Sequence, residues 1–254
     1  MGEVPESHPR YASLMARKML TDAAEAGMLA DSALIAHGRG EAFDYLLGEN
    51  TCEPARKAIV ETAARLQSSE QCVISVNGNT VALAGSQLIA CAAVLNCPIE
   101  VNIYYRTPER MEALLSALQV QRQQAVELYP ELLSQISDVE ILGGAPDGRI
   151  PNLDGPRANC HSDGILSADT ILVPLEDGDR CEALIAMGKT VCVIDLNPLS
   201  RTARTATVTI VDELTRCVQI LLECLRQEPA PENTDWDNDA NLQAAIELIL
   251  RRFE

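Results

Sequence analysis

Short runs of apolar, often β-branched residues alternate along the chain with longer segments of helical periodicity. The runs predict six strands: QCVISV (71–76), IEVNIYY (99–105), VEILG (139–143), TILVP (170–174), TVCVIDL (190–196) and TVTIV (207–211). They are continuously apolar, which is typical of parallel strands covered on both faces. Helical patterns occupy 53–69, 85–96, 107–136 with a break near Pro130, 180–188 and 212–227, and two more, 10–28 and 40–48, precede the first strand. This alternation predicts an α/β fold built on a Rossmann-like, doubly wound, mainly parallel six-stranded sheet.

Two segments depart from this rhythm. Residues 144–168 are rich in glycine, proline and aspartate and are too long for a routine connection, so we expect a lid, a binding loop or disorder. Residues 228–239 read as an acidic linker, and a final amphipathic helix over 240–253 is expected to pack on the body or on a second subunit. The predicted organisation is therefore a domain over 1–227, with N-terminal helices at 10–48, followed by the linker and C-terminal helix of 228–254.

The net charge of the chain argues against some classes of binding partner. The 254 residues carry a formal net charge of −17, and nucleic acid and anionic membranes both require a basic footprint, so neither is expected as a partner. Only Lys18, Lys57 and Lys189 among the 20 basic residues are lysine. Arginine grips carboxylate and phosphate bidentately, although genomic base composition would produce the same bias.

The nine cysteines form no CxxC pair and no Cys/His metal spacing. An odd number of cysteines, with no signal-peptide pattern at the start, predicts a reducing, cytoplasmic location. No apolar run is expected to approach the length of a membrane span.

Ligands of open parallel sheets bind beyond the carboxyl ends of the strands. Polar groups follow four of the predicted strands: Asn77-Gly78-Asn79, Arg106, Glu176-Asp177-Gly178-Asp179-Arg180 and Asn197 to Arg201. Each has an ordinary alternative, because Asn-Gly marks turns, aspartate and asparagine cap helices, and one arginine is a surface charge. Their recurrence at four strand ends favours a binding site on this edge.

A fifth candidate is the stretch His37-Gly38-Arg39-Gly40-Glu41, at the start of the helix predicted over 40–48. The glycines would let backbone N–H groups approach an anion, and the helix dipole would favour one there. A plain helix start with two turn glycines is the alternative.

Several familiar sites are missing from the sequence. There is no Walker A motif, no GxGxxG, no evident Ser-His-Asp or Cys-His arrangement, and only three histidines. A metal would be Mg²⁺ held by few carboxylates and by phosphate, with Asp177 and Asp179 as candidates. A Rossmann-type NAD(P)-dependent oxidoreductase would explain the sheet but lacks the glycine fingerprint, and a non-catalytic nucleotide-binding protein is a further alternative.

The sequence resembles the archaeal phosphopantothenate synthetases, which are 4-phosphopantoate–β-alanine ligases of the archaeal coenzyme A pathway. The matching blocks are SHPRY (7–11), AHGRGEAFDYL (36–46), SVNGN (75–79), YYRT with Arg106, VPLEDGDRCEAL (173–184) and IDLNPLSRTAR (194–204). The likeness runs in order from about residue 4 to 215, whereas 120–138 and the C-terminal tail depart from it. In the long loop it is confined mainly to RIPNL (149–153) and GI (164–165).

The resemblance implies an ATP-dependent ligase that joins 4-phosphopantoate and β-alanine to form 4′-phosphopantothenate. AMP and pyrophosphate would be released through a phosphopantoyl-adenylate intermediate. It also implies a homodimer, and that 1–227 is the catalytic domain binding ATP and phosphopantoate.

The resemblance also implies roles for individual residues. ATP would be bound by Arg17, Arg39, the 177–182 stretch with Asp177, Gly178, Asp179, Arg180 and Cys181, and by Asp195, Leu196 and Asn197. Phosphopantoate would lie near His37, Gly38, Asn77, Gly78, Asn79 and Arg106. The residues expected to act in catalysis are His37, Arg39 and Arg180, and Asp177 or Asp179 would hold Mg²⁺.

Overall fold

Six parallel strands form the central sheet of the computed structural model, which describes residues 4–251. Their order is β3-β2-β1-β6-β7-β8. The strands are β1 (Cys72–Val76), β2 (Ile99–Val101), β3 (Ile141–Leu142), β6 (Thr170–Pro174), β7 (Thr190–Ile194) and β8 (Val208–Ile210). All five neighbouring pairs are parallel, which confirms the predicted fold class. The strand order reverses between β1 and β6, where open α/β sheets bind their ligands.

Helices and irregular segments cover both faces of the sheet. The longer helices are α1 (Tyr11–Glu25), α2 (Asp31–Leu47), α3 (Glu53–Ser68), α4 (Gly78–Leu95), α5 (Pro108–Leu128), α9 (Leu214–Leu225) and α10 (Asn238–Leu250). The shorter ones are α6 (Leu133–Asp138), α7 (Gly178–Ala186) and α8 (Arg201–Thr205). Alternate strand residues face opposite sides: Ile74 and Leu172 pack with α3, α4, α5 and α9, whereas Val73 and Ile171 pack with α7 and the segment before β6.

The helix α4 is the core helix of the first face. It is 18 residues long with a mean hydropathy of 1.5, so among residues 4–251 it alone is long and apolar enough to cross a membrane by length and composition. The expectation that no apolar run approaches this length is therefore wrong. In the fold, however, 72% of this stretch is buried, as expected of a helix packed against a sheet and two neighbouring helices.

Two helix starts differ from the sequence prediction. The helix α2 begins at Asp31 after the extended residue Ala30, so the His37–Glu41 stretch lies inside a helix and not at its mouth. The predicted helix mouth at this stretch is therefore wrong, and so is the alternative of a helix start with two turn glycines, because Gly38 and Gly40 lie inside α2. The helix α4 begins at Gly78 rather than near 85, because the Asn77 side chain accepts from the Thr80 amide at 3.1 Å and caps it. The break expected near Pro130 is confirmed, since α5 ends at Leu128.

The long segment 144–168 is packed against the second face of the sheet. It contains a small antiparallel pair, β4 (Gly148–Arg149) and β5 (Asn159–Cys160), and buries Ile150 and Ile165 completely. The buried carboxylate of Glu100 on β2 accepts from the amides of His161 at 3.0 Å and Ile165 at 2.8 Å. Burial raises the pKa of Glu100, and these two amides oppose that effect. The segment is thereby fixed to the sheet.

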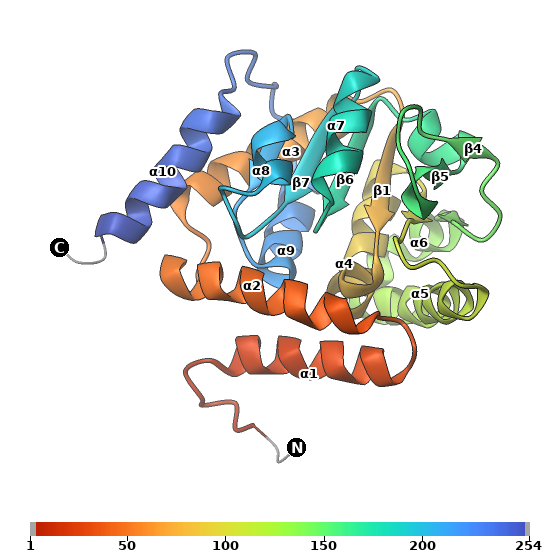
Figure 1. The fold of residues 1–254 in the computed structure, drawn as a ribbon, viewed down its shortest axis with the longest axis horizontal. Coiled ribbons are helices and arrows are strands. Elements are labelled where there is room, and N and C mark those ends of the chain that lie inside the picture. Colours follow the sequence, from red (N-terminus) through yellow and green to blue (C-terminus); the bar gives the residue numbers. More distant parts are fainter. Residues whose placement is uncertain (1–3, 252–254) are drawn as a thin grey trace.

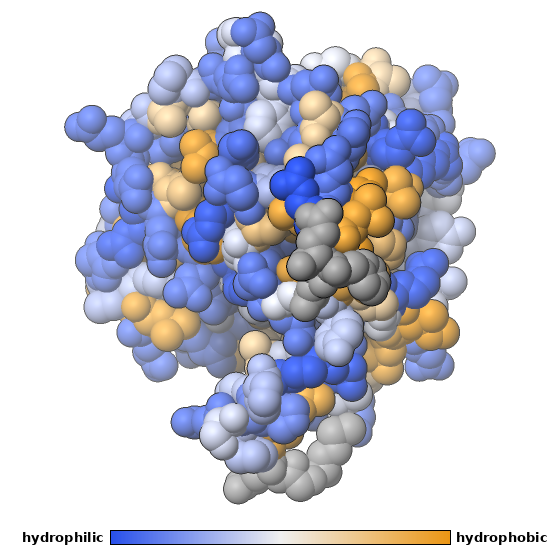
Figure 2. Space-filling model, turned by 90° about the vertical axis from the view of Figure 1, so that its left-hand side faces the viewer, coloured by the Kyte–Doolittle hydropathy of each residue, from blue (hydrophilic) through white to orange (hydrophobic). Residues whose placement is uncertain are grey.

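The first helix, α1, lies at the bottom of the body and the last helix, α10, at its left in Figure 1. The helices α1 and α2 form a hairpin, and α2 lies along the carboxyl edge of the sheet. The helix α10 packs on α2, α3 and α8 through Leu242 and Ala245, which confirms packing on the body as one of the two expected roles. The α10 side of the molecule is mostly hydrophilic with small apolar patches (Figure 2), in keeping with the net charge. The predicted helix over 240–253 extended into residues 252 and 253, which lie outside the described residues, and the division at 227 stays a prediction.

Candidate functional site at the carboxyl edge of the sheet

A cavity of about 550 Å³ opens at the switch point between β1 and β6. This volume is in the range of small-molecule sites in proteins. Its walls come from the start of α2, the start of α4, the segment after β2, the start of α7 and the long segment before β6. Seven of the predicted site residues line it together: Asn77, Gly78, Asn79, Asp177, Gly178, Asp179 and Arg180.

The Asn77-Gly78-Asn79 turn joins the sheet to the N-terminal hairpin. Asn77 donates to the Leu175 carbonyl at 2.9 Å, and Asn79 donates to the Ala33 carbonyl at 3.1 Å. A Cβ on Gly78 would lie 2.8 Å from the Met28 carbonyl oxygen, closer than real Cβ atoms come to other heavy atoms. Glycine at this position therefore lets the α1–α2 connection close one wall of the cavity.

The two carboxylates expected to hold Mg²⁺ are each engaged by an arginine. Asp177 pairs with Arg157, and Asp179 pairs with Arg201. Within residues 4–251 no group of three or more His, Cys, Asp or Glu side chains is placed to hold a metal ion. Any magnesium here would depend on phosphate oxygens for most of its ligands.

Arg180 lies on the floor of the cavity and is almost fully buried. Its Nη2 donates to Ser75 Oγ at 2.7 Å, and its Nε lies 2.9 Å from Glu176 Oε2 without hydrogen-bond alignment. Burial lowers the pKa of Arg180, and Glu176 opposes that effect. The Arg180 guanidinium is therefore a fixed positive charge, and not all of its N–H donors are hydrogen-bonded within the described residues.

The sequence did not reveal Arg157, which lies beside Arg180. Its Nε donates to Asn102 Oδ1 at 3.2 Å, and its Nη1 lies 3.2 Å from Glu176 Oε1 and also contacts Asp177. Burial would lower the pKa of Arg157, but Glu176 and Asp177 more than offset it. The residue sits in the irregular stretch GPRAN, and no motif marks it.

A second group of predicted residues gathers where α2 crosses the segment after β7. A Cβ on Gly40 would lie 3.4 Å from Leu196 Cδ1, so the helix and this segment are in close contact. Burial raises the pKa of Asp195, while Ser200, the Asn197 amide and the nearby Arg39 guanidinium oppose that effect. Arg39 itself is exposed. This arrangement brings the predicted Arg39 and Asp195–Asn197 elements together.

Arg17 on α1 and His37 on α2 lie around Glu41 on α2. Arg17 Nε donates to both Glu41 oxygens at 2.8 and 3.0 Å. Burial lowers the pKa of His37, and Glu41 opposes that effect. His37 and Gly38 do not line the cavity beside Asn77–Asn79, although the same ligand was expected to contact all of them.

Two other predicted residues face away from the cavity. The Arg106 guanidinium donates to the Gly143 carbonyl and lines a neighbouring hollow with Tyr104, Tyr105 and Arg110. The Cys181 side chain is buried toward α8, with Sγ 3.9 Å from the Thr202 carbonyl oxygen, and burial raises its pKa to about 12. Its backbone amide is also engaged, because it donates to the Asp177 carbonyl at 3.1 Å.

Comparison with known proteins gives a consistent result over nearly the whole chain. The phosphopantothenate/pantothenate synthetase family model matches residues 54–252, so the match includes the C-terminal helix, which the resemblance seen in the sequence blocks does not reach. A 4-phosphopantoate–β-alanine ligase of Methanospirillum hungatei is 47% identical over 254 residues, covering 98% of both chains. The ligase of the same name from Thermococcus onnurineus is 46% identical over 227 residues, covering 89% of this chain and 82% of the relative. The ligase from Methanosarcina mazei is 42% identical over 256 residues, covering 98% of this chain and 95% of its own. This chain belongs to the phosphopantothenate/pantothenate synthetase family.

Proposed function

We propose that this chain is an ATP-dependent 4-phosphopantoate–β-alanine ligase of coenzyme A biosynthesis. The observation that carries the proposal is the 42–47% identity to three archaeal ligases of that name, which extends over 89–98% of this chain. The chemistry of the cavity agrees with it. Both main substrates are polyanions, and the cavity floor carries two buried guanidinium groups beside two helix N-termini.

The proposed reaction has two steps. An oxygen of the phosphopantoate carboxylate attacks the α-phosphorus of ATP, the bond to the β-phosphate breaks, and pyrophosphate leaves with the bonding electrons. The neutral amine of β-alanine then attacks the acyl carbon of this adenylate, AMP leaves with the bonding electrons of the acyl–phosphate bond, and the amine loses a proton. Such displacements need positioned substrates and fixed positive groups more than a nucleophilic side chain, and the cavity supplies these.

We assign ATP to the region where α2, the segment after β7 and the start of α7 converge. The proposed contacts are Arg17, Arg39, Asp195, Leu196, Asn197 and residues 177–182. Support comes from the approach of Gly40 to Leu196 and of Arg39 to Asp195. Mg²⁺ would accompany the triphosphate, with Asp177 and Asp179 as the nearest carboxylates.

We assign phosphopantoate to the cavity, with Asn77, Gly78 and Asn79 at one wall and Arg180 at the floor. His37, Gly38 and Arg106 stay proposed contacts, and each would require movement of a neighbouring segment, because none of them lines the cavity. His37, Arg39 and Arg180 are the residues proposed to act on the reacting groups.

A cytoplasmic homodimer is the proposed state of the enzyme. Ile35 on α2 is 69% exposed and Leu199 after β7 is 64% exposed, which offers an apolar surface near the ATP region to a second copy. Sedimentation of the pure protein would measure the subunit number.

The decisive test is a pyrophosphate-release assay with ATP, 4-phosphopantoate and β-alanine, with unphosphorylated pantoate as the control substrate. The proposal predicts release that depends on both acid and amine and is much slower with pantoate. Equal rates with pantoate would indicate a different synthetase. ATP binding without any release would indicate a non-catalytic nucleotide-binding protein, and binding of NADH but not ATP would indicate an oxidoreductase.

A further inference from the structure

Two buried arginines on the floor of the cavity share one buried ion-pair partner, and the buried carboxylate of Glu100 also acts on Arg180. Arg157 comes from the long segment before β6, and Arg180 from the first turn of α7, and their side chains are 8% and 1% exposed. The buried carboxylate facing both of them is Glu176. The second carboxylate near them, Asp177, has a side chain that is 57% exposed and is thus free to leave.

Arg180 has donors that no described residue satisfies. Its Nη2 donates to Ser75 and its Nε is ion-paired with Glu176 without hydrogen-bond alignment, whereas Nη1 has no hydrogen-bond acceptor in the described part of the chain. Buried donors in proteins nearly always have acceptors, because an unpaired one costs free energy. A buried guanidinium that lines a cavity and has one nitrogen without an acceptor suits a ligand that supplies an oxygen atom.

Asp177 shows which kind of ligand fits. It occupies the position before α7 where an aspartate side chain ordinarily caps the helix, yet its side chain makes no capping hydrogen bond. Its carboxylate pairs with Arg157 instead, beside the start of α7. The pair shows that a carboxylate fits against this guanidinium.

We propose that Arg157, together with Arg180, binds the reacting carboxylate of the acyl substrate, and that Asp177 occupies this position until the substrate displaces it. The inference rests on the proposed ligase function. The carboxylate that attacks ATP must lie beside the α-phosphate, and the start of α7, which we assign to ATP, adjoins both arginines. β-Alanine reacts through its amine, so its carboxylate points away from the reaction centre. Arginine forks bind carboxylates bidentately, which fixes the attacking oxygen.

The first test pairs a change in the ligand with a change in the protein. Binding of 4-phosphopantoate and of its carboxamide analogue to the full chain is measured by calorimetry for wild type and Arg157→Ala. We expect wild type to prefer the acid by roughly 100-fold, and Arg157→Ala to bind the two about equally, since charge-paired recognition is lost. Retained preference in Arg157→Ala overturns the proposal, as does a defect confined to the KM for β-alanine.

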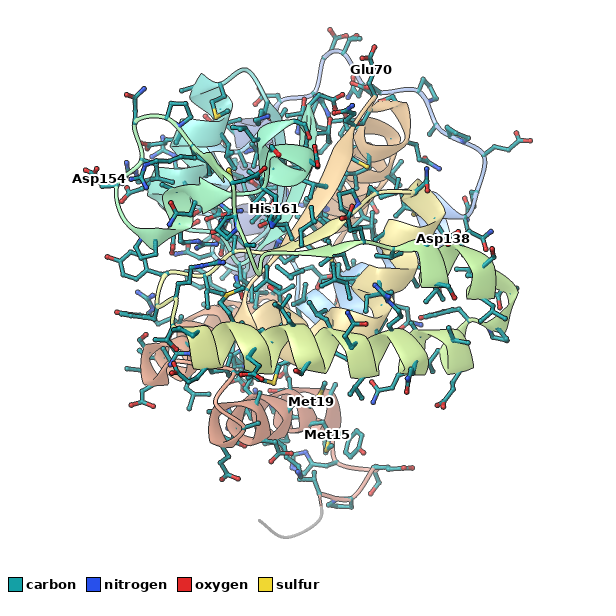
Figure 3. The ribbon with its side chains drawn as sticks, turned by 90° about the vertical axis from the view of Figure 1, so that its right-hand side faces the viewer. Met15, Met19, Glu70, Asp138, Asp154 and His161 are labelled. Carbon is teal, nitrogen blue, oxygen red and sulfur yellow. The ribbon has the colours of Figure 1, made fainter. Side chains whose placement is uncertain are left out.

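The second test removes the carboxylate that competes for Arg157 and leaves both arginines unchanged. Asp177→Asn removes the competing carboxylate and should tighten 4-phosphopantoate binding about tenfold. Asp154→Asn is the matched control, because Asp154 also lines the cavity but is exposed, at the left edge of the molecule in Figure 3. If both variants bound 4-phosphopantoate equally more tightly, the cause would be the loss of one negative charge near the cavity. Weaker binding by Asp177→Asn would contradict the proposal that the substrate displaces Asp177.

The outcomes separate this inference from the proposed function. A wild-type protein that releases no pyrophosphate and binds no 4-phosphopantoate refutes the ligase itself. A wild-type protein that turns over, with an Arg157→Ala variant that still discriminates acid from amide, refutes only the role of Arg157. Circular dichroism checks that Arg157→Ala is folded, and if it is not, the Asp177→Asn and Asp154→Asn pair decides.

Discussion

Glu176 and Arg180 form an ion pair in which neither side chain is more than 1% exposed, with Oε2 and Nε 2.9 Å apart. Glu176 also faces Arg157, so one buried carboxylate pairs with both guanidinium groups. Its removal would leave buried positive charge uncompensated, which is costly in a low-dielectric interior.

We therefore predict that Glu176→Gln lowers the free energy of unfolding by about 3 kcal/mol. Urea denaturation followed by circular dichroism would show this as a lower midpoint. Asp179→Asn is the control, because its carboxylate is exposed and exposed ion pairs contribute little to stability. An unchanged midpoint for Glu176→Gln would mean that the arginines do not depend on it.

Arg39 is predicted to be essential for turnover but not for folding. It is exposed on α2 near Asp195, so Arg39→Ala should abolish pyrophosphate release while the thermal melt stays close to that of wild type. Arg204→Ala removes another exposed arginine, on α8, and should remain active. Turnover of Arg39→Ala near the wild-type rate would show that our assignment is wrong.

Asp169 is predicted to contribute a pH-dependent part of the stability at the amino edge of the sheet. Burial would raise its pKa, but hydrogen bonds from Ser69 and from the amides of Gln71 and Glu70 lower it overall. A carboxyl whose pKa is lower in the folded state stabilises the folded protein when the pH is above the unfolded-state pKa of about 3.9. This stabilisation is lost as the pH falls through the pKa of the folded state.

The measurement is the difference in melting temperature between wild type and Asp169→Asn from pH 7 to pH 3. It should be largest near neutral pH and shrink toward the acid end. Asp138→Asn, exposed at the end of α6 (Figure 3), should show no such trend. A difference for Asp169→Asn that grows with acidity would mean that folding raises the pKa of Asp169 instead of lowering it.

The C-terminal helix is predicted to be part of the cooperative body. Leu242 is buried against α2 and α8 residues, so Leu242→Ala should cost about 2–5 kcal/mol of unfolding free energy. Leu250→Ala makes the same change at a position on α10 that is 65% exposed and should cost far less. Separate unfolding transitions in the Leu242→Ala variant would instead favour a boundary near 227.

Hydrophobic periodicity was sufficient to predict the sheet, because the pattern that marks each strand lies within a few consecutive residues. The bounds of β6 agree with prediction, because Asp169 precedes the apolar run and Pro174 ends it shortly before the charged stretch that begins at Glu176. In α2, the sequence pattern placed Gly38 and Gly40 at the start of a helix, but they lie inside a longer helix that begins at Asp31. Arg157 could not be predicted from the sequence, because its partners Asp177 and Asn102 lie 20 and 55 residues away along the chain. Burial alone makes that arginine distinctive, and burial is a property of the folded chain.

The close contact between Gly78 and Met28 has a practical consequence for anyone who shortens this protein. The family model begins to match at residue 54, so a fragment trimmed to that match would look complete. It would lack the hairpin whose Met28, Leu29 and Ala33 wall the cavity. Such a fragment would retain the sheet, but its cavity would lack one wall. If the fragment were inactive, the result would not test the catalytic role of the residues that remain.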